Sequence, residues 1–142
     1  MRMLLTLLLF LAIAATAWPA PVHCQGRISH QVPAVVGNDG GLIFVTISFV
    51  PADNGDGDIF AGVYPRLGVS TQESIDQAIS YAYASSDKNL SCDVIVSFGS
   101  SDTSYIDGPS AGAALSVMTY ALLHNRTLRN DTIITGSIED LG

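Results

Sequence analysis

Basic residues are scarce in this sequence, and the shortage excludes several classes of function. Six lysines and arginines stand against thirteen aspartates and glutamates, which gives the 142-residue chain a formal net charge of −7 at pH 7. No basic stripe is available to neutralise phosphates, so we expect no nucleic-acid partner. Electrostatic docking on anionic lipid is disfavoured for the same reason. The length leaves room for one domain.

Cysteine is equally sparse. Cys24 and Cys92 are too few for a disulfide scaffold or for a zinc site of the Cys-x-x-Cys type. The phosphate-binding pattern Gly-x-x-x-x-Gly-Lys-Ser/Thr is also absent from the sequence. We therefore expect no metal and no cofactor. The two cysteines either form one disulfide outside the cell or remain two unpaired thiols, because the sequence does not give the distance between them.

The N-terminal residues 1–17 have the composition of an export signal. Arg2 provides a short positive region, and residues 3–17 form an uncharged apolar run that ends in the small-x-small pattern Ala15-Thr16-Ala17. The run is shorter than the about 20 residues that a spanning helix needs. We expect a secreted or extracytoplasmic protein, with an uncleaved membrane tether through residues 3–17 as the alternative.

Three triplets match the acceptor pattern for N-linked glycans, at Asn89, Asn125 and Asn130. Such triplets often occur by chance, so here they predict only that these asparagines lie in exposed loops. Lys88, the one lysine of the chain, stands beside the first triplet and is expected to be a solvated surface charge.

The order of local patterns predicts an α+β fold. Residues 18–40 contain three prolines and a Gly-Asn-Asp-Gly cluster, which predicts an irregular lead-in or linker. The expected elements that follow are strands over 42–50 and 59–64, a helix from 70 or 71 to about 85, a strand over 93–98, a helix over 109–123 and a strand over 132–138. We expect a mixed β-sheet with packed helices over residues 41–142.

The two expected helices differ in character. Ser70 or Thr71 should cap the first one, with Glu73 as an acid in its first turn. Pro109 suits the first position of the second helix, where its missing N–H costs nothing. The second helix is apolar nearly all round and should therefore run through the core.

The segment Asp107-Gly108-Pro109-Ser110-Ala111-Gly112 is the candidate site. Ser110 falls in the first turn of a helix, where N–H groups have no internal partners and could stabilise a developing oxyanion. Gly108 would let the backbone approach a substrate without a Cβ in the way. Serine is, however, also common at helix starts without any catalytic role.

Two further arrangements are disfavoured by their context. Gly108-x-Ser110-x-Gly112 matches the nucleophile elbow of α/β-hydrolases, but an elbow follows its strand directly and the strand over 93–98 ends well before it. His124, the only histidine after Ser110, belongs to the same helix, so a Ser-His-Asp triad has no suitable histidine. A lysine held neutral by burial can activate a serine instead.

The candidate segment strongly resembles the catalytic-serine motif of the Lon protease domain. The resemblance extends to a glycine-led strand at Gly41–Val50, a helix entered through Glu73-Ser74, an Asp-Val-Ile-Val strand from Asp93 and the Thr-Gly-x-Ile stretch Thr135–Ile138. It therefore covers the chain from about residue 41 to its last residue. It implies that residues 41–142 are the N-terminal part of a Lon-like proteolytic domain, apparently truncated at its C-terminus.

The resemblance also implies roles for individual residues. Ser110 corresponds to the nucleophile, Thr135 to a threonine beside the catalytic pair, and Asp107 to an acidic position just before the serine that shapes the site. The family's general base is a lysine beyond the Thr-Gly-x-Ile stretch, which this sequence does not reach.

The expected signal peptide stands where typical Lon proteins carry an ATPase module. The implied function is therefore an ATP-independent serine endopeptidase that acts on unfolded proteins or peptides through a Ser-Lys dyad, and that could assemble as a homo-oligomeric ring. The alternative is a non-catalytic Lon-like module for assembly or peptide binding, without the general base.

Overall fold

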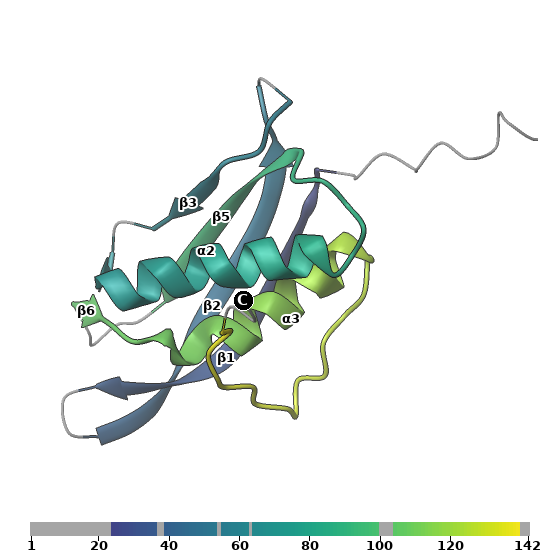
Figure 1. The fold of residues 1–142 in the computed structure, drawn as a ribbon. Helices are drawn as coiled ribbons and strands as arrows, with labels where there is room; N and C mark the ends of the chain where they lie inside the picture. The colour runs from purple at the N-terminus through teal and green to yellow at the C-terminus, as the bar shows by residue number, and fades with distance from the viewer. Residues whose placement is uncertain (1–23, 37–38, 54, 63, 100–103, 140–142) are drawn as a thin grey trace, which may run out of the picture.

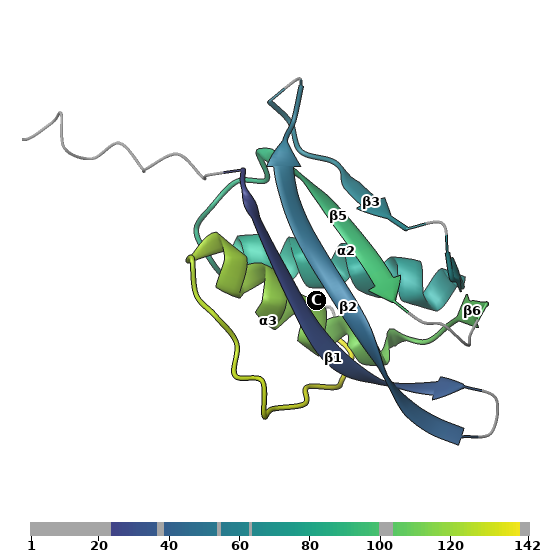
Figure 2. The ribbon, with the colours of Figure 1, turned by 180° about the vertical axis from the view of Figure 1, so that it is seen from behind.

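The structure, a computed structural model, describes residues 24–36, 39–53, 55–62, 64–99 and 104–139. In these ranges a four-stranded sheet carries two helices on one face, as Figure 1 shows, and the view from behind in Figure 2 shows no helix over the opposite face. This confirms the expected α+β architecture with a multi-stranded mixed sheet. None of the helices in the same ranges is both long and apolar enough to cross a membrane. Residues 1–17, the expected export signal, lie outside them.

The sheet has the strand order β1-β2-β5-β3. The strands are β1 (Gly26–Val36), β2 (Asp39–Pro51), β3 (Ile59–Ala61) and β5 (Cys92–Gly99), and the helices are α2 (Val69–Ala84) and α3 (Gly112–Leu123). A short pair, β4 (Arg66–Leu67) and β6 (Tyr105–Ile106), lies beside the sheet, and the 3-10 turn η1 (Pro109–Ala111) leads into α3. β1 and β5 both run antiparallel to β2, whereas β3 runs parallel to β5.

The core lies between the sheet and the helices. Burial alternates along β5, so that one set of its side chains faces α2 and α3 while the other faces outward. The fully buried side chains of largest volume come from the middle strands and from both helices, and include Ile47, Ile75, Ile79, Leu115 and Met118. The strands expected over 42–50 and 93–98 are therefore confirmed as the centre of the sheet.

The expectation that residues 18–40 are irregular is wrong for 26–36. These residues form β1, which pairs with β2 from Gly26 opposite Phe49 to Val36 opposite Asp39. Pro33 is tolerated because β1 is an edge strand, where a missing N–H need not break a ladder. Val32 is 1% exposed and belongs to the core, so this segment is part of the domain.

The last strand, expected over 132–138, is not formed. Residues 132–139 belong to no helix or strand. Their backbone hydrogen bonds go to η1 and α3: the N–H of Gly136 donates to the Ser110 carbonyl, and the Gly136 carbonyl accepts from the N–H of Ala113. The segment runs back along α3 (Figure 1). Where it passes β1, the Thr132 carbonyl oxygen accepts a side-chain hydrogen bond from Nε2 of His30 at 2.7 Å, and no backbone ladder forms between the described residues there.

Both helices depart in detail from expectation. α2 begins after Gly68, without a side-chain cap of its own and without an acid in its first turn, so the expected roles of Ser70, Thr71 and Glu73 there are wrong. The helix start is occupied by a carboxylate from another part of the chain, described below. α3 is not surrounded by the core, because Val117 and Tyr120 are 41% and 36% exposed on the side away from the sheet.

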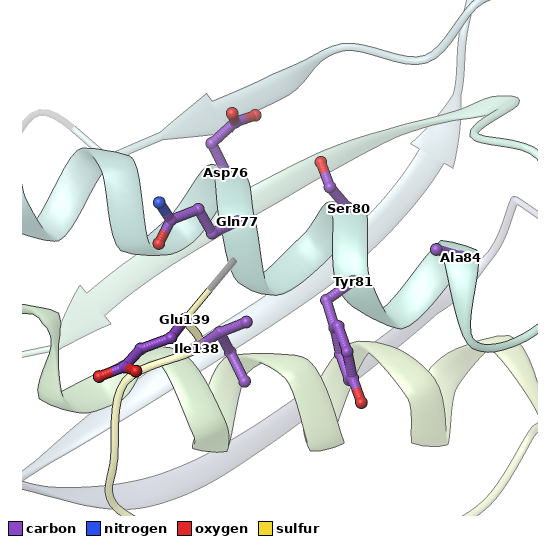
Figure 3. A pocket seen from close by; sticks show the side chains of 7 residues that line it. All are labelled: Asp76, Gln77, Ser80, Tyr81, Ala84, Ile138 and Glu139. Atoms are coloured by element: carbon purple, nitrogen blue, oxygen red, sulfur yellow. The ribbon is translucent and has the colours of Figure 1, made fainter. Parts of the chain in front are cut away.

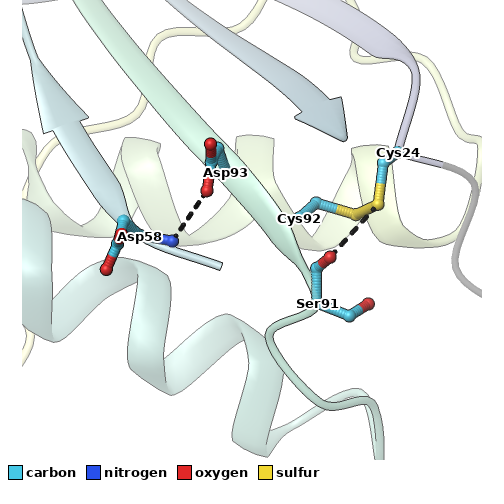
Figure 4. The surroundings of a disulfide bond; sticks show 5 residues. All are labelled: Cys24, Asp58, Ser91, Cys92 and Asp93. Carbon is cyan, nitrogen blue, oxygen red and sulfur yellow. Dashed lines mark hydrogen bonds between the residues drawn. A yellow bond between two sulfur atoms is a disulfide. The ribbon is translucent and has the colours of Figure 1, made fainter. Parts of the chain in front are cut away.

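A disulfide joins Cys24 to Cys92 at the start of β5, which settles the alternative that the sequence left open (Figure 4). Their Cα atoms are 5.3 Å apart. The Sγ of Cys24 also lies 3.5 Å from the carbonyl oxygen of Ser91. Because a disulfide sulfur carries no proton, we read this approach as packing. In the same figure the Asp93 carboxylate accepts a hydrogen bond from the N–H of Asp58, which fastens the segment before β3 to β5.

Candidate active site at the start of α3

Ser110 lies at the entrance to α3 with its side chain exposed. It is the middle residue of η1, and Pro109 stands at the first position of that turn, as predicted. Gly108, immediately before the turn, has a φ of +121°, a conformation that favours glycine. The local backbone therefore places the Ser110 hydroxyl at the surface, where another molecule can reach it.

An open groove of about 550 Å³ runs beside Ser110. Its walls are the end of the β1–β2 hairpin, Ser110 of η1 and the segment after α3. The lining residues are Pro33, Ala34, Val35, Gly40, Gly41, Leu42, Ser110 and Thr135. Val35 and Leu42 are 80% and 48% exposed, so the hairpin offers apolar surface to a ligand. A smaller recess of about 80 Å³ shares Ser110 and reaches the buried side chains of Ile43 and Phe98.

Thr135, the predicted neighbour of Ser110, does lie next to it. The Thr135 hydroxyl donates to the backbone carbonyl oxygen of Ser110 at 3.1 Å, and the N–H of Gly136 donates to the same oxygen at 2.8 Å. Gly136 has a φ of +138°, which suits glycine. Two donors from the segment after α3 thus fix the orientation of the Ser110 carbonyl.

Asp107 lines the small recess together with Ser110 and supports the loop that carries the serine. Its carboxylate accepts hydrogen bonds from the N–H groups of Gly108 (2.9 Å) and Thr71 (3.3 Å) and from the Tyr105 hydroxyl (3.1 Å). It therefore caps the N-terminus of α2, where a negative charge is favoured. Gly68 lies so close that a Cβ at this position would collide with the carboxylate. Within the described residues none of these bonds reaches Ser110, so Asp107 holds the loop that carries the serine.

The ionisation of Asp107 follows from these contacts. Partial desolvation raises the pKa of the carboxyl, but the N–H of Gly108, the Tyr105 hydroxyl and the N–H groups of Thr71 and Ser70 together lower it below its usual value. The hydrogen bond from the Tyr105 hydroxyl to Asp107 raises the pKa of Tyr105 above its usual value, and desolvation and the negative charge of Asp107 add to the effect. The carboxylate therefore stays ionised at neutral pH, the form in which it can only accept hydrogen bonds.

Two buried hydroxyls of α2 also hold the serine loop, and sequence reasoning missed them. Thr71 donates to the Gly108 carbonyl and Ser74 to the Pro109 carbonyl, each at 3.1 Å, and the two side chains are 1% and 2% exposed. The C=O and N–H of one planar trans peptide point in opposite directions, so the N–H of Ser110 points away from Ser74. The sequence could have pointed to these two residues, because both hydroxyls fall on the apolar, buried face of the predicted helix.

Gly112 has a packing role in this arrangement. A Cβ at Gly112 would lie 2.8 Å from the Ser74 hydroxyl oxygen and 3.2 Å from the backbone nitrogen of Ile138. Only a residue without a side chain lets α2, α3 and the final segment approach one another here. The last glycine of the predicted motif is thus explained by close contact between three parts of the chain.

Two candidate bases, Lys88 and His124, lie at the other end of α3. Lys88 is half-buried and its Nζ donates to the carbonyl oxygen of Leu123 at 2.6 Å, so the expectation of a fully solvated charge is wrong. It compensates one of the free carbonyls at the end of the helix. The ring of His124 packs on Tyr120, with centroids 4.3 Å apart. At a rise of 1.5 Å per residue, both groups are about 18 Å along the helix axis from its start, too far to take a proton from Ser110.

A second groove, of about 430 Å³, lies between α2 and the final segment (Figure 3). Its lining is Asp76, Gln77, Ser80, Tyr81, Ala84, Ile138 and Glu139. In Figure 3 Asp76 and Ser80 point away from Ile138, while Tyr81 points toward α3. Among the described residues no base is hydrogen-bonded to Ser80, so this groove offers no activated nucleophile.

The chemistry of the first groove is that of an exposed serine on a pre-shaped turn. The backbone N–H of Ser110 lies in the first turn of the helix, so it has no partner within the helix and can stabilise a developing negative charge. The structure brings Ser110, Gly108 and Thr135 together, with Asp107 supporting the loop behind them. Neither a family model nor a curated protein matches this chain, so the function has to be argued from these residues.

Proposed function

We propose that this protein is a serine endopeptidase with a Lon-like proteolytic fold, and that Ser110 is its nucleophile. The observation that carries the proposal is the exposed Ser110 hydroxyl at the junction of an apolar groove and a small recess. Its motif resembles that of the Lon family, whose members use a Ser-Lys dyad. The substrates are unfolded proteins or peptides, and the reaction does not require ATP.

In the proposed reaction the Ser110 oxygen attacks the scissile carbonyl carbon and its proton passes to a neutral amine. The carbonyl oxygen becomes an oxyanion, which the N–H of Ser110 stabilises. Ser74 and Thr71 hold the preceding carbonyls and thereby keep that N–H in place. Lys88 cannot be the amine because it is bound at the far end of α3, so the proposal assigns the base to a lysine outside this sequence.

The recess beside Ser110 suggests a preference for small side chains next to the cleaved bond. Its volume of about 80 Å³ would exclude a large side chain, and its lining combines apolar groups such as Ile43 and Phe98 with the Asp107 carboxylate. We also propose that the protein acts outside the cytoplasm, with residues 3–17 as a cleaved signal or a tether. A disulfide between Cys24 and Cys92 supports an oxidising compartment.

One observation favours a second candidate, a peptide-binding or assembly module without catalysis. Within the described residues both Lys88 and His124 are separated from Ser110 by the length of α3. If no base reaches Ser110, the groove can still hold an extended apolar peptide without cleaving it. The codons that follow Gly142 separate the candidates: a lysine after a Gly-Gly turn favours the enzyme, and a stop codon favours the module.

A covalent probe tests the enzyme directly. A fluorophosphonate-type reagent should label the full-length protein and its Ser80→Ala variant, in which an exposed serine of the other groove is removed. It should not label Ser110→Ala. Labelling that survives Ser110→Ala removes this residue from the mechanism, whereas binding of an unfolded peptide without labelling or cleavage supports the module.

A further inference from the structure

The three glycan-acceptor triplets fall on surfaces that a glycan could occupy. Asn89 follows α2, Asn125 follows α3, and Asn130 stands at a turn further on; all three are exposed. In the part of the chain that the structure describes, none of the three side-chain amides forms a hydrogen bond with another group. A carbohydrate attached to any of them would therefore displace no contact.

The backbone of Asn125 is fixed independently of its side chain. Its φ is +51°, its N–H donates to the Leu122 carbonyl at 3.1 Å, and the N–H of Arg126 donates to the Ala121 carbonyl at 2.7 Å. These two bonds form the Schellman ending of α3, in which asparagine is a common substitute for glycine. The helix end thus explains the conformation of Asn125 but makes no use of its amide, nor of Thr127, the residue that completes the triplet.

The triplets also lie close to one another in space. Lys88, the neighbour of Asn89, binds the Leu123 carbonyl, two residues before Asn125. Asn125 and Asn130 line one depression of about 340 Å³ between the start of β1 and the segment after α3. That depression has no residue in common with the groove beside Ser110. Figure 1 shows that α2 and α3 end at the same end of the molecule, whereas Ser110 precedes α3 at the other.

We propose that Asn89, Asn125 and Asn130 carry N-linked glycans, which cover the end of the molecule where α3 terminates and leave the Ser110 groove open. In the transfer, the amide nitrogen of asparagine forms a bond to C1 of an oligosaccharide. The bond from C1 to the diphosphate of a lipid carrier breaks, the lipid diphosphate leaves, and the amide loses one proton. The lipid-linked donor and the transferase belong to the secretory membrane, so the modification depends on export and not on the peptidase function.

Matched variants test the proposal without disturbing the helix end. The full chain is produced in eukaryotic secretory cells and treated with a peptide N-glycosidase, which converts each modified asparagine to aspartate. Thr127→Ala removes the Asn125 triplet while keeping the asparagine that the Schellman ending needs, and Thr127→Ser keeps the triplet. Ser91→Ala with Ser91→Thr, and Thr132→Ala with Thr132→Ser, are the corresponding pairs for the other two sites.

We expect the untreated chain to migrate more slowly than the glycosidase-treated chain by three increments. Each alanine variant should lose one increment, and its hydroxyl-bearing counterpart should retain it. After glycosidase treatment, aspartate should be found at all three positions. A secreted, disulfide-bonded chain whose mobility the glycosidase does not change would overturn the proposal. Retention of the chain in the cytosol with both cysteines reduced would overturn it as well. An alanine variant that migrates like its counterpart would refute modification at that asparagine.

Discussion

Removal of the Cys24–Cys92 disulfide should destabilise the domain substantially. The bond closes a loop between residues 68 apart in the sequence, and the chain-entropy relation gives about 4 kcal/mol for a loop of this length at 25 °C. Domains of this size unfold with about 5–15 kcal/mol, so the bond supplies a large share of the total. Cys24→Ser is the better substitution, because Cys24 is only half-buried whereas Cys92 is 0% exposed.

The assay is urea unfolding of the full chain produced with its disulfide intact, followed by circular dichroism. Oxidised wild type should unfold at a clearly higher urea concentration than Cys24→Ser, and a thiol reductant should bring the wild type down to the variant. The reductant should leave Cys24→Ser unchanged, which is the control for unspecific effects. Equal midpoints for oxidised wild type and Cys24→Ser would refute the reasoning.

Three further predictions concern single side chains. Tyr83→Phe should raise the free energy of unfolding by about 1 kcal/mol, because the Tyr83 hydroxyl is buried without a hydrogen-bond partner among the described residues. Burial raises the pKa of Tyr83 to about 12, so wild type should lose more stability than the variant as the pH rises from about 10 through 12 in alkaline melts; a less stable variant at neutral pH contradicts the first expectation. The pKa of Asp107 is lowered, so its carboxylate should stabilise the fold fully above the ordinary aspartate pKa of about 4, and this stabilisation should disappear as the pH falls through the lowered pKa of Asp107. Asp107→Asn should therefore flatten the acidic part of the curve of stability against pH. An unchanged acidic part of that curve argues against Asp107 as the cap of α2. Ser74→Ala should slow probe labelling of Ser110 by at least about tenfold, below the 10²–10³ cost of a whole oxyanion donor, and Ser74→Thr should restore it; equal rates would show that the Pro109 carbonyl needs no support from α2.

The parts of the fold that could be predicted are those whose conformation depends only on residues close together in the sequence. β-Branched and aromatic residues indicated the strands around Ile47 and Val96, and Pro109 marked the start of a helix because its missing N–H is harmless there. The prolines of residues 18–40 pointed to a linker, but Pro33 lies in an edge strand whose pairing with β2 depends on residues later in the chain. Strand propensity over 132–138 did not produce a strand, because the backbone of Gly136 forms its hydrogen bonds with Ser110 of η1 and Ala113 of α3.

The site shows the same division. Ser110 and Thr135 could be singled out through their motifs, but the contacts that connect Asp107 to the start of α2, and Thr71 and Ser74 to the serine loop, join residues 35 to 37 positions apart. A helix face seen in a sequence shows which residues are buried. It does not show which carbonyls their hydroxyls will meet.

By itself, the amino-acid sequence determined the class of the fold, the acidic surface that disfavours nucleic acid, and the serine that opens an apolar helix, because composition and short-range periodicity act within a few residues. Only the tertiary structure decided that Cys24 pairs with Cys92, that Lys88 closes the far end of α3, and that a hairpin forms a groove beside Ser110. Each of these outcomes depends on the distance between residues that are far apart in the chain, which is set when the helices pack on the sheet.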